Sequence, residues 1–321
     1  MTDGALIEAK HVDRYYGKVC AVHDLSLTIH RGEVLGFLGP NGAGKSTSMR
    51  IIAGTLAPSA GSVKVGGNDI LEQPRAAKAL IGYLPEQPPL YRDATVDEYL
   101  TYCGRLHRIP ASQLRESLCQ VKNRCGLEDA GRRLIGNLSK GYQQRVGIAQ
   151  AVIHAPAIVI LDEPTVGLDP IQIREIRALI KELGADHSVI LSTHILPEVQ
   201  AVCNRVAIIH QGQLVLDEQL DSLDGEPCVR LRIGFQHPPE PTSLQSVAGV
   251  AAVAPIDERR FRIESLVDLD PTEMLVHRSV QENWGLFELV RERRSLEETF
   301  VQLTCGDEGA RQELQTEKAA W

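Results

Sequence analysis

The sequence predicts an α/β fold with a largely parallel sheet, followed by a smaller α+β domain. Over the first 220 residues, short β-type runs alternate with segments whose apolar residues recur at helical spacing, which is typical of a parallel sheet covered by helices. A glycine-rich turn joins one of these runs to a helical segment. Near residue 220 the pattern changes, and 321 residues are enough for roughly two domains of ordinary size.

Buried strands are expected where the chain is continuously apolar, because both faces of a parallel sheet are covered. The runs that fit are EVLGFLG (33–39), IGYLP (81–85), AIVILD (157–162), SVILST (188–193) and VAIIH (206–210). An earlier segment, AVHDLSLTIHRGE (21–33), alternates apolar and polar residues up to a turn. It predicts a half-exposed strand in an antiparallel β subdomain.

Helical patterns fill the chain from about residue 90 to 155, between two of the predicted strands, and indicate an inserted helical subdomain. The first domain is therefore expected to span residues 1–222. Residues 223–305 combine β-type runs with two helical patterns and predict a small α+β domain, for which a ferredoxin-like βαββαβ order is one arrangement that fits. Residues 306–321 form a polar tail.

Composition excludes several classes of protein. The net charge of -8 and pI near 5.7 argue against a general nucleic-acid-binding surface, so no nucleic-acid partner is expected. The 7 cysteines are scattered without CxxC spacing, as in a reduced intracellular protein. The N-terminal stretch lacks the apolar core of a signal peptide, and no later run has the length of a membrane span. Any membrane role is expected to come from a partner.

The stretch GFLGPNGAGKST (36–47) has the phosphate-loop pattern, between a predicted strand and a predicted helix. In this pattern, backbone N–H groups and the helix N-terminus face the anion, while the lysine neutralises the outer phosphates. The hydroxyl of Ser46 is expected to bind Mg²⁺. The predicted nucleotide contacts are Gly39, Pro40, Asn41, Gly42, Ala43, Gly44, Lys45, Ser46 and Thr47.

The run IVILDEPT (158–165) supplies the second half of the predicted site. Asp162 ends a buried strand, where its carboxylate can hold Mg²⁺ directly or through water. Glu163 follows at once and is placed to orient and polarise an attacking water as a general base. Since the chain has no NKxD element for reading guanine, a GTPase is disfavoured and ATP is the expected nucleotide.

With both halves in place, residues 5 to 220 resemble the ATP-binding subunit of an ABC transporter. The stretch NLSKGYQQRV (137–146) is similar to the LSGGQ signature of that family. Ser139 and Gly141 are retained, whereas Lys140 replaces the first glycine and Tyr142 replaces the final glutamine. In the family this segment meets the γ-phosphate of ATP bound to the opposite subunit, which implies that role for Ser139 and Gly141.

The remaining family elements occur in the expected order. Tyr16 resembles the aromatic residue that stacks on adenine, and its neighbour Tyr15 is the alternative. Gln87 resembles the glutamine that reaches Mg²⁺ and water when the site closes. Asp169 resembles the aspartate of the D-loop at the subunit interface, and His194 resembles the switch histidine that contacts the γ-phosphate.

The resemblance implies an ATPase that dimerises on ATP, most simply as a homodimer, and powers a separate polytopic membrane permease from the cytoplasmic face of the inner (cell) membrane. The signature region and the segment SLEETFVQLT (295–304) are most similar to bacterial export ATPases associated with gliding motility, multidrug export and nitrous oxide reductase maturation, so residues 223–305 are expected to be an accessory domain. The alternative is a soluble ABC-type ATPase acting on ribosomes or DNA without a permease. Such proteins usually fuse two ATPase halves or insert a coiled coil, and this sequence has neither. A binding module without activity is disfavoured because Lys45, Asp162, Glu163 and His194 are all present.

Overall fold

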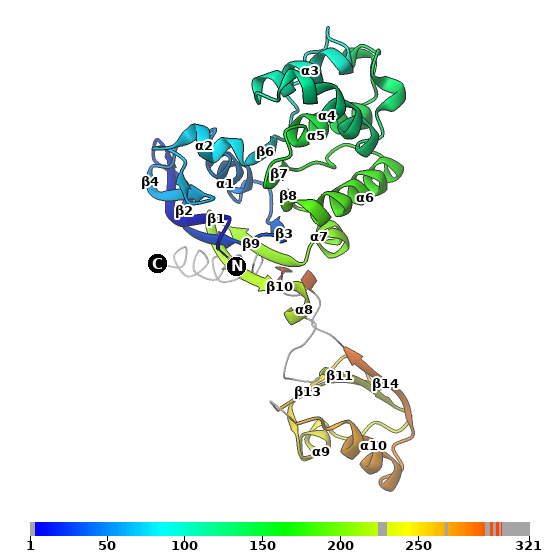
Figure 1. Cartoon of the computed structure of the whole chain (residues 1–321). Helices are drawn as coiled ribbons and strands as arrows, with labels where there is room; N and C mark the ends of the chain where they lie inside the picture. The colour runs from blue at the N-terminus through cyan, green and yellow to red at the C-terminus, as the bar shows by residue number, and fades with distance from the viewer. Residues whose placement is uncertain are drawn as a thin grey trace, which may run out of the picture. The chain divides into compact units, whose positions relative to one another are not determined.

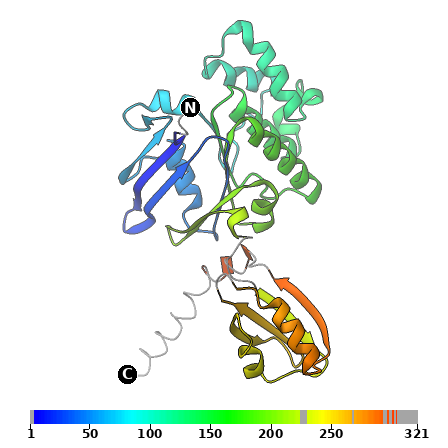
Figure 2. The same cartoon turned by 60° about the horizontal axis from the view of Figure 1, so that its bottom comes forward.

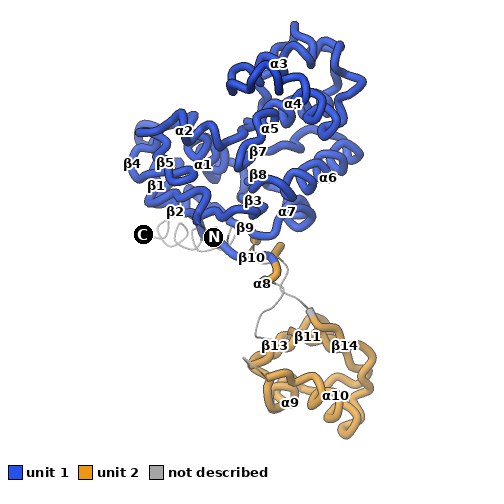
Figure 3. Tube along the Cα trace, viewed as in Figure 1, with its two compact units in different colours: residues 1–220, 307–321 blue, residues 221–306 orange. Residues whose placement is uncertain are grey.

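The computed structural model describes residues 4–223, 230–266 and 269–292, together with residues 296, 297, 300, 301 and 303. The chain divides after Leu220 into two compact units, of which unit 2 begins at Asp221 (Figure 3). The predicted polar tail and half of the SLEETFVQLT segment lie outside the described residues. Within the described part of the chain, no helix is long and apolar enough to cross a membrane.

The centre of unit 1 is the predicted parallel sheet. Its described strands lie in the order β10-β9-β3-β8-β7-β6, all parallel except the edge strand β10. Every residue of β3, β7 and β8 is buried, which explains why these segments read as uninterrupted apolar runs. The strands are β3 (Val34–Leu38), β6 (Ile81–Leu84), β7 (Ile158–Asp162), β8 (Ser188–Thr193), β9 (Arg205–His210) and β10 (Gln213–Gln219).

A second, antiparallel sheet packs against helix α1, and its order is β2-β1-β4-β5. The predicted half-exposed strand is confirmed as β2, which pairs with β1. One apolar core joins this sheet, α1 and one face of the central sheet. The elements are β1 (Ile7–Tyr16), β2 (Val19–Ile29), α1 (Lys45–Ile52), β4 (Ala60–Val65), β5 (Asn68–Asp69) and α2 (Pro74–Ala79).

The predicted helical insertion lies between β6 and β7, at the top of Figure 1. A capping box between Thr95 and Glu98 starts its first helix. The insertion shares a second apolar core with the other face of the central sheet. The helices of the insertion are α3 (Val96–Leu106), α4 (Ala111–Arg124) and α5 (Lys140–Val152), with 3₁₀ turns at Glu128–Ala130 and Ile135–Asn137. Later in the chain come α6 (Pro170–Asp186), α7 (Leu196–Val202) and α8 (Leu220–Leu223), and the boundary between the two units falls within α8.

Unit 2 has the βαββαβ order that the sequence pattern allowed. Its antiparallel strands lie in the order β12-β13-β11-β14, and helices α9 and α10 pack against the sheet (Figure 2). Leu244 of α9 and Leu275 of α10 belong to its apolar core. The elements are β11 (Arg230–Phe235), α9 (Pro241–Gln245), β12 (Val250–Pro255), β13 (Arg260–Ser265), α10 (Thr272–Gln281) and β14 (Leu286–Glu292).

Candidate nucleotide-binding site

The predicted phosphate loop connects the buried strand β3 to α1. Gly42 and Gly44 have positive φ angles of 79° and 104°, a conformation that favours glycine. A side chain at Gly39 would place its Cβ 2.4 Å from the carbonyl oxygen of Ile209, and one at Gly44 would lie 2.4 Å from that of Ala21. Backbone conformation therefore favours glycine at position 42, close packing requires it at position 39, and both reasons apply at Gly44.

The N-terminus of α1 faces the same loop. The first N–H groups of a helix have no partner within the helix and carry the positive end of its dipole. No acidic side chain lies in the first turn of α1, whose residues are all described. The turn is therefore free to bind an external anion such as a phosphate.

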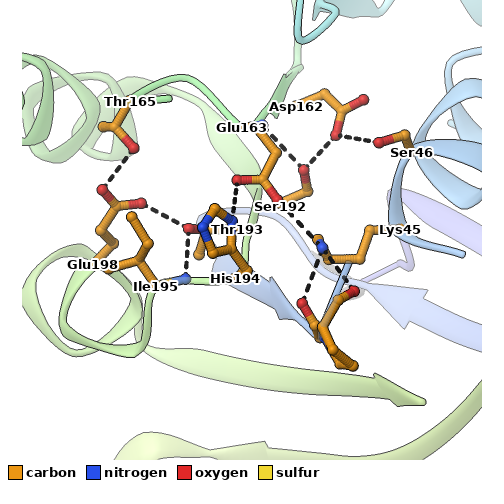
Figure 4. A network of polar contacts seen from close by, with 12 residues as sticks. Lys45, Ser46, Asp162, Glu163, Thr165, Ser192, Thr193, His194, Ile195 and Glu198 are labelled. Carbon is orange, nitrogen blue, oxygen red and sulfur yellow. Dashed lines mark hydrogen bonds and ion pairs between the residues drawn. The ribbon is translucent and has the colours of Figure 1, made fainter. Parts of the chain in front are cut away.

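Lys45 is nearly inaccessible, with 5% of its side chain exposed. Its ammonium donates to the carbonyl oxygens of Gly39 (2.9 Å) and Pro40 (3.1 Å) and lies 3.3 Å from Oε1 of Glu163. The contacts hold the positive charge over the loop (Figure 4).

Asp162 lies at the carboxyl end of β7, as predicted. Its Oδ1 accepts hydrogen bonds from the hydroxyls of Ser46 (3.2 Å) and Ser192 (2.5 Å). Burial raises the pKa of Asp162, the two hydroxyl groups oppose that shift, and the charges of Glu163 and Glu86 add to it. The carboxylate and the Ser46 hydroxyl thus lie together beside the phosphate loop.

Glu163 occupies an unusual backbone position, with a φ of 49°. Its N–H donates to the backbone and side-chain oxygens of Ser192, both at 3.1 Å. Its Oε2 lies 2.9 Å from Nδ1 of His194, which follows strand β8 (Figure 4). Residues predicted separately from two parts of the sequence thus meet at the ends of adjacent parallel strands.

These side chains border a cleft of about 410 Å³. The described residues that line it are Ala21, Asn41, Gly42, Gly44, Lys45, Ser46, Thr47, Glu86, Glu163, Val166 and His194. The cleft combines phosphate-binding backbone, one lysine and a carboxylate beside a histidine, which suits the binding of a nucleoside triphosphate and its attack by water.

Comparison with known proteins identifies the family. Residues 22–166 match the family described as ABC transporter. The ABC transporter ATP-binding protein NatA of Bacillus subtilis (strain 168) is 43% identical over 207 residues, covering 64% of this chain and 84% of that protein. The chain belongs to the ATP-binding subunits of ABC transporters. ATP hydrolysis is the general activity of this family, and its ATP-binding subunits associate with membrane permeases and dimerise.

Another relative matches this ABC subunit over more of its length, and solved structures match its fold. The linearmycin resistance ATP-binding protein LnrL of Bacillus subtilis (strain 168) is 29% identical and covers 93% of this chain and 98% of that protein. A solved ATP-binding subunit of an ABC transporter has a TM-score of 0.62 at 30% identity, covering 68% of this chain and 91% of that one. The dimeric cassette MJ0796, bound to ADP and Pi in a post-hydrolysis state, has a TM-score of 0.60 at 26% identity, covering 67% of this chain and 98% of that one.

Several predicted site residues of this ABC subunit lie outside the cleft of their own chain. Among the described residues, the lining of the cleft does not include Tyr16, Gln87, Ser139, Gly141 or Asp169. It also does not include Gly39, Pro40, Ala43 or Asp162, but these adjoin lining residues of the phosphate loop and of the end of β7. Tyr15 and Tyr16 are equally exposed, at 43%, and the guanidinium of Arg14 lies 4.9 Å from the ring of Tyr16. Gln87 is exposed, and its neighbour Glu86 is the residue that lines the cleft.

Ser139 and Asp169 are helix caps in this ABC subunit. Ser139 precedes α5 and accepts a hydrogen bond from the N–H of Tyr142. Asp169 precedes α6 and accepts from the N–H groups of Ile171 and Gln172. Gly141 is buried, and a Cβ there would lie 2.6 Å from the side chain of Gln172. The signature segment therefore packs directly on the helix that follows the D-loop.

Two members of the site were not predicted from the sequence. Ser192 hydrogen-bonds both to Asp162 and to the backbone of Glu163, and Glu86 contributes a third carboxylate. The only sequence signal for Ser192 was its place near the end of a buried strand, two residues before His194. Serine is too common at strand ends for that signal to be distinctive.

The residues present fit the Mg²⁺ ion that the family implies. Asp162 and Ser46 offer hard oxygen ligands side by side. Among the described residues, no group of three His, Cys, Asp or Glu side chains is placed to hold a metal without help. Mg²⁺ is usually held by one or two protein ligands together with substrate phosphates, so this sparse set is of the right kind.

Proposed function

We propose that this chain is the energising subunit of an exporter, in which two copies close head to tail over two ATP molecules and drive a separate polytopic permease from the cytoplasmic face of the membrane. The observation that carries the proposal is the position of the signature segment. Ser139, Gly141 and Asp169 have the family's motifs, yet they lie together at the starts of α5 and α6, where Gly141 packs on Gln172, and none of them is among the described residues that line the cleft. A second copy supplies them to the bound ATP.

The names of relatives support the export direction. LnrL is called a linearmycin resistance protein, and BcrA of Bacillus licheniformis, which is 34% identical over 220 residues, is called a bacitracin transport protein. The solved cassette MJ0796 is dimeric. Resistance to a toxic compound is a task suited to an exporter, and two copies would bring each signature segment to the partner's nucleotide.

In the proposed reaction, the phosphate loop and Lys45 hold the phosphates and Tyr16 stacks on the adenine. Asp162 and Ser46 would hold Mg²⁺, joined by Gln87 when the site closes, and the ion would neutralise charge on the outer phosphates. Phosphate oxygens in the cleft compete with Glu163 for the ammonium of Lys45, since the two groups are only 3.3 Å apart. Glu163 then has a carboxylate oxygen available to take a proton from the attacking water.

His194 completes the proposed arrangement. Its Nδ1 faces Glu163 at 2.9 Å, and 40% of its side chain is exposed. The imidazole is thereby oriented by the carboxylate, and its opposite edge is the one available to the γ-phosphate. Unit 2 carries none of these residues and acts as an accessory domain that regulates or braces the dimer.

Replacement of Glu163 by glutamine tests the proposal. Glu163→Gln should bind ATP but hydrolyse it at least about a hundredfold more slowly, because removal of a general base typically costs 10²–10⁴ in rate. With ATP it should accumulate as a dimer by size-exclusion chromatography. The matched control is Glu116→Gln, which removes an exposed acid of α4 outside the cleft and should leave turnover within about threefold.

The opposite-subunit role of the signature is tested in the same background. The double variant Ser139→Ala, Glu163→Gln should bind ATP by calorimetry yet dimerise less than Glu163→Gln alone. A monomeric Glu163→Gln protein with normal turnover would sink the whole proposal. Equal dimerisation of the double variant would remove only the role of Ser139.

A further inference from the structure

Glu198 of α7 is a buried carboxylate that the predicted reaction does not use. Its side chain is 1% exposed. Its Oε1 accepts a hydrogen bond from the hydroxyl of Thr165 at 2.6 Å, and its Oε2 accepts one from the hydroxyl of Thr193 at 2.8 Å (Figure 4). Thr165 lies two residues after Glu163, and Thr193 lies one residue before His194. One carboxylate therefore holds both segments that carry the Glu163–His194 contact.

The directions of these hydrogen bonds are fixed by the surrounding atoms. The Thr193 hydroxyl oxygen accepts a hydrogen bond from the N–H of Ile195 at 3.0 Å, which leaves its proton to be donated to Glu198. The Thr165 hydroxyl also donates to Glu198. A carboxylate offers two acceptor oxygens to these two donors, whereas a glutamine amide would turn an N–H₂ group toward one of them.

The cost of burying this charge indicates that the arrangement is specific. An ionised carboxylate removed from water is destabilising by several kcal/mol unless it is hydrogen-bonded or paired. Here two charge-assisted hydrogen bonds and Nη2 of Arg177, at 3.6 Å from Oε1, compensate the charge. Arg177 belongs to α6, so Glu198 links α6, the turn after β7 and the end of β8.

Glu163 is the residue that most needs such support. Its φ of 49° is strained for a side chain with a Cβ, and such strain persists only where neighbours hold the backbone. Ser192 holds the N–H of Glu163 from one side. Thr165 anchors the same turn from the other side through Glu198. The 2.9 Å contact between Glu163 and His194 joins residues that each lie close in sequence to one of these anchors: Thr165 follows Glu163 by two residues, and Ser192 precedes His194 by two.

We propose that Glu198 is a positioning residue for ATP hydrolysis, which clamps the Glu163 turn and the His194 strand end in register through Thr165 and Thr193. This inference rests on the proposed roles of Glu163 and His194. A displacement of about 1 Å at a reacting group can cost roughly 100-fold in rate. Among the described residues, the side-chain hydrogen bonds and ion pair of Lys45 go to Gly39, Pro40 and Glu163, and none goes to Glu198, Thr165 or Thr193. Altering the clamp should therefore change ATP binding little.

The first test compares kcat with KM. Glu198→Gln should lower kcat about tenfold or more and leave the KM for ATP within about twofold, since the lost interaction acts on the reacting geometry alone. A folded Glu198→Gln protein with unchanged kcat would overturn the inference. So would a matched rise in KM, because it would mean general damage to the cleft.

The threonines give matched pairs that keep the inference testable if Glu198→Gln fails to fold. Thr165→Val is nearly isosteric but removes the donor, whereas Thr165→Ser keeps it. Valine should lower kcat severalfold and serine should restore it, and the same pattern is expected at Thr193. Equal kcat for the serine and valine variants at both positions would overturn the inference.

A final arm separates this inference from the proposed function. In a Glu163→Gln background, Glu198→Gln should add less than about a twofold further loss, since a positioning residue acts through the group it positions. If Glu163→Gln itself hydrolyses ATP normally, the proposed role of Glu163 fails. If Glu163→Gln is slow as expected, but Glu198→Gln lowers kcat by the same factor in that background as in the native chain, the positioning role of Glu198 is contradicted and the role of Glu163 is not.

Discussion

Charged side chains are buried at the edge of the central sheet of unit 1, whereas those on the sheet of unit 2 are partly exposed. At the carboxyl edge of the central sheet, Lys45 and Glu163 face each other with 5% and 8% of their side chains exposed. On the strands of unit 2, Glu288 pairs with Arg232 and Arg260, and these three side chains are between 21% and 45% exposed. The first arrangement is buried around a cleft, and the second is partly exposed to solvent.

The difference follows from strand direction. The carboxyl ends of parallel strands converge on one edge, where residues distant in sequence meet in a crevice. An antiparallel sheet with helices on one face leaves alternate residues on the other, where opposite charges pair across neighbouring strands. Charge at the edge of the central sheet is therefore available for chemistry, whereas charge on the sheet of unit 2 mainly neutralises its neighbours.

The largest effect is expected at Lys45. Lys45→Ala should weaken ATP binding at least about tenfold, because the ammonium neutralises the outer phosphates and also compensates the buried Glu163. Calorimetric titration with ATP measures this. Lys181→Ala, an exposed lysine of α6, is the control and should bind like the native chain. If Lys45→Ala bound ATP with native affinity, the charge at the carboxyl edge of the central sheet would have no more effect on nucleotide binding than the charges on unit 2.

A smaller effect is expected at Glu288. Glu288→Ala should reduce the free energy of unfolding of unit 2 by no more than about 1 kcal/mol, because solvent and salt screen exposed pairs. Its ATP affinity should not change. Chemical denaturation of Glu288→Ala, Arg260→Ala and the double variant gives the coupling energy. A coupling energy well above about 1 kcal/mol would show that the ion pair of Glu288 and Arg260 contributes substantially to the stability of unit 2.

The smallest effect on nucleotide binding is expected from removal of unit 2 as a whole. A chain ended near Asp221 should keep the ATP affinity of the full protein, because the described residues that line the cleft all fall between Ala21 and His194. Circular dichroism first establishes that the shortened chain is folded. Loss of ATP binding by the folded fragment would contradict the comparison, whereas loss of dimerisation alone would agree with an accessory role.

The sequence was sufficient where function is encoded in neighbouring residues. The glycines, Lys45 and Ser46 follow one another along the chain, and their roles depend on local conformation and on the start of one helix. The pair Asp162 and Glu163 could be placed at a strand end because the preceding residues are continuously apolar. The parallel sheet was predictable for the same reason. Short-range patterns carry this information because backbone conformation and burial are both set by residues close in sequence.

Only the tertiary structure decided which distant side chains complete the site. Ser192 and Glu86 are ordinary polar residues in the sequence, and nothing nearby marks them as neighbours of Asp162. Glu198 looks like an exposed residue of a short helix, yet it is buried between Thr165 and Thr193. The same packing leaves Ser139 and Asp169 outside the cleft of their own chain. These relations arise from how β7, β8, α6 and α7 pack together, and a pattern along one segment does not record the distance from a side chain to another segment.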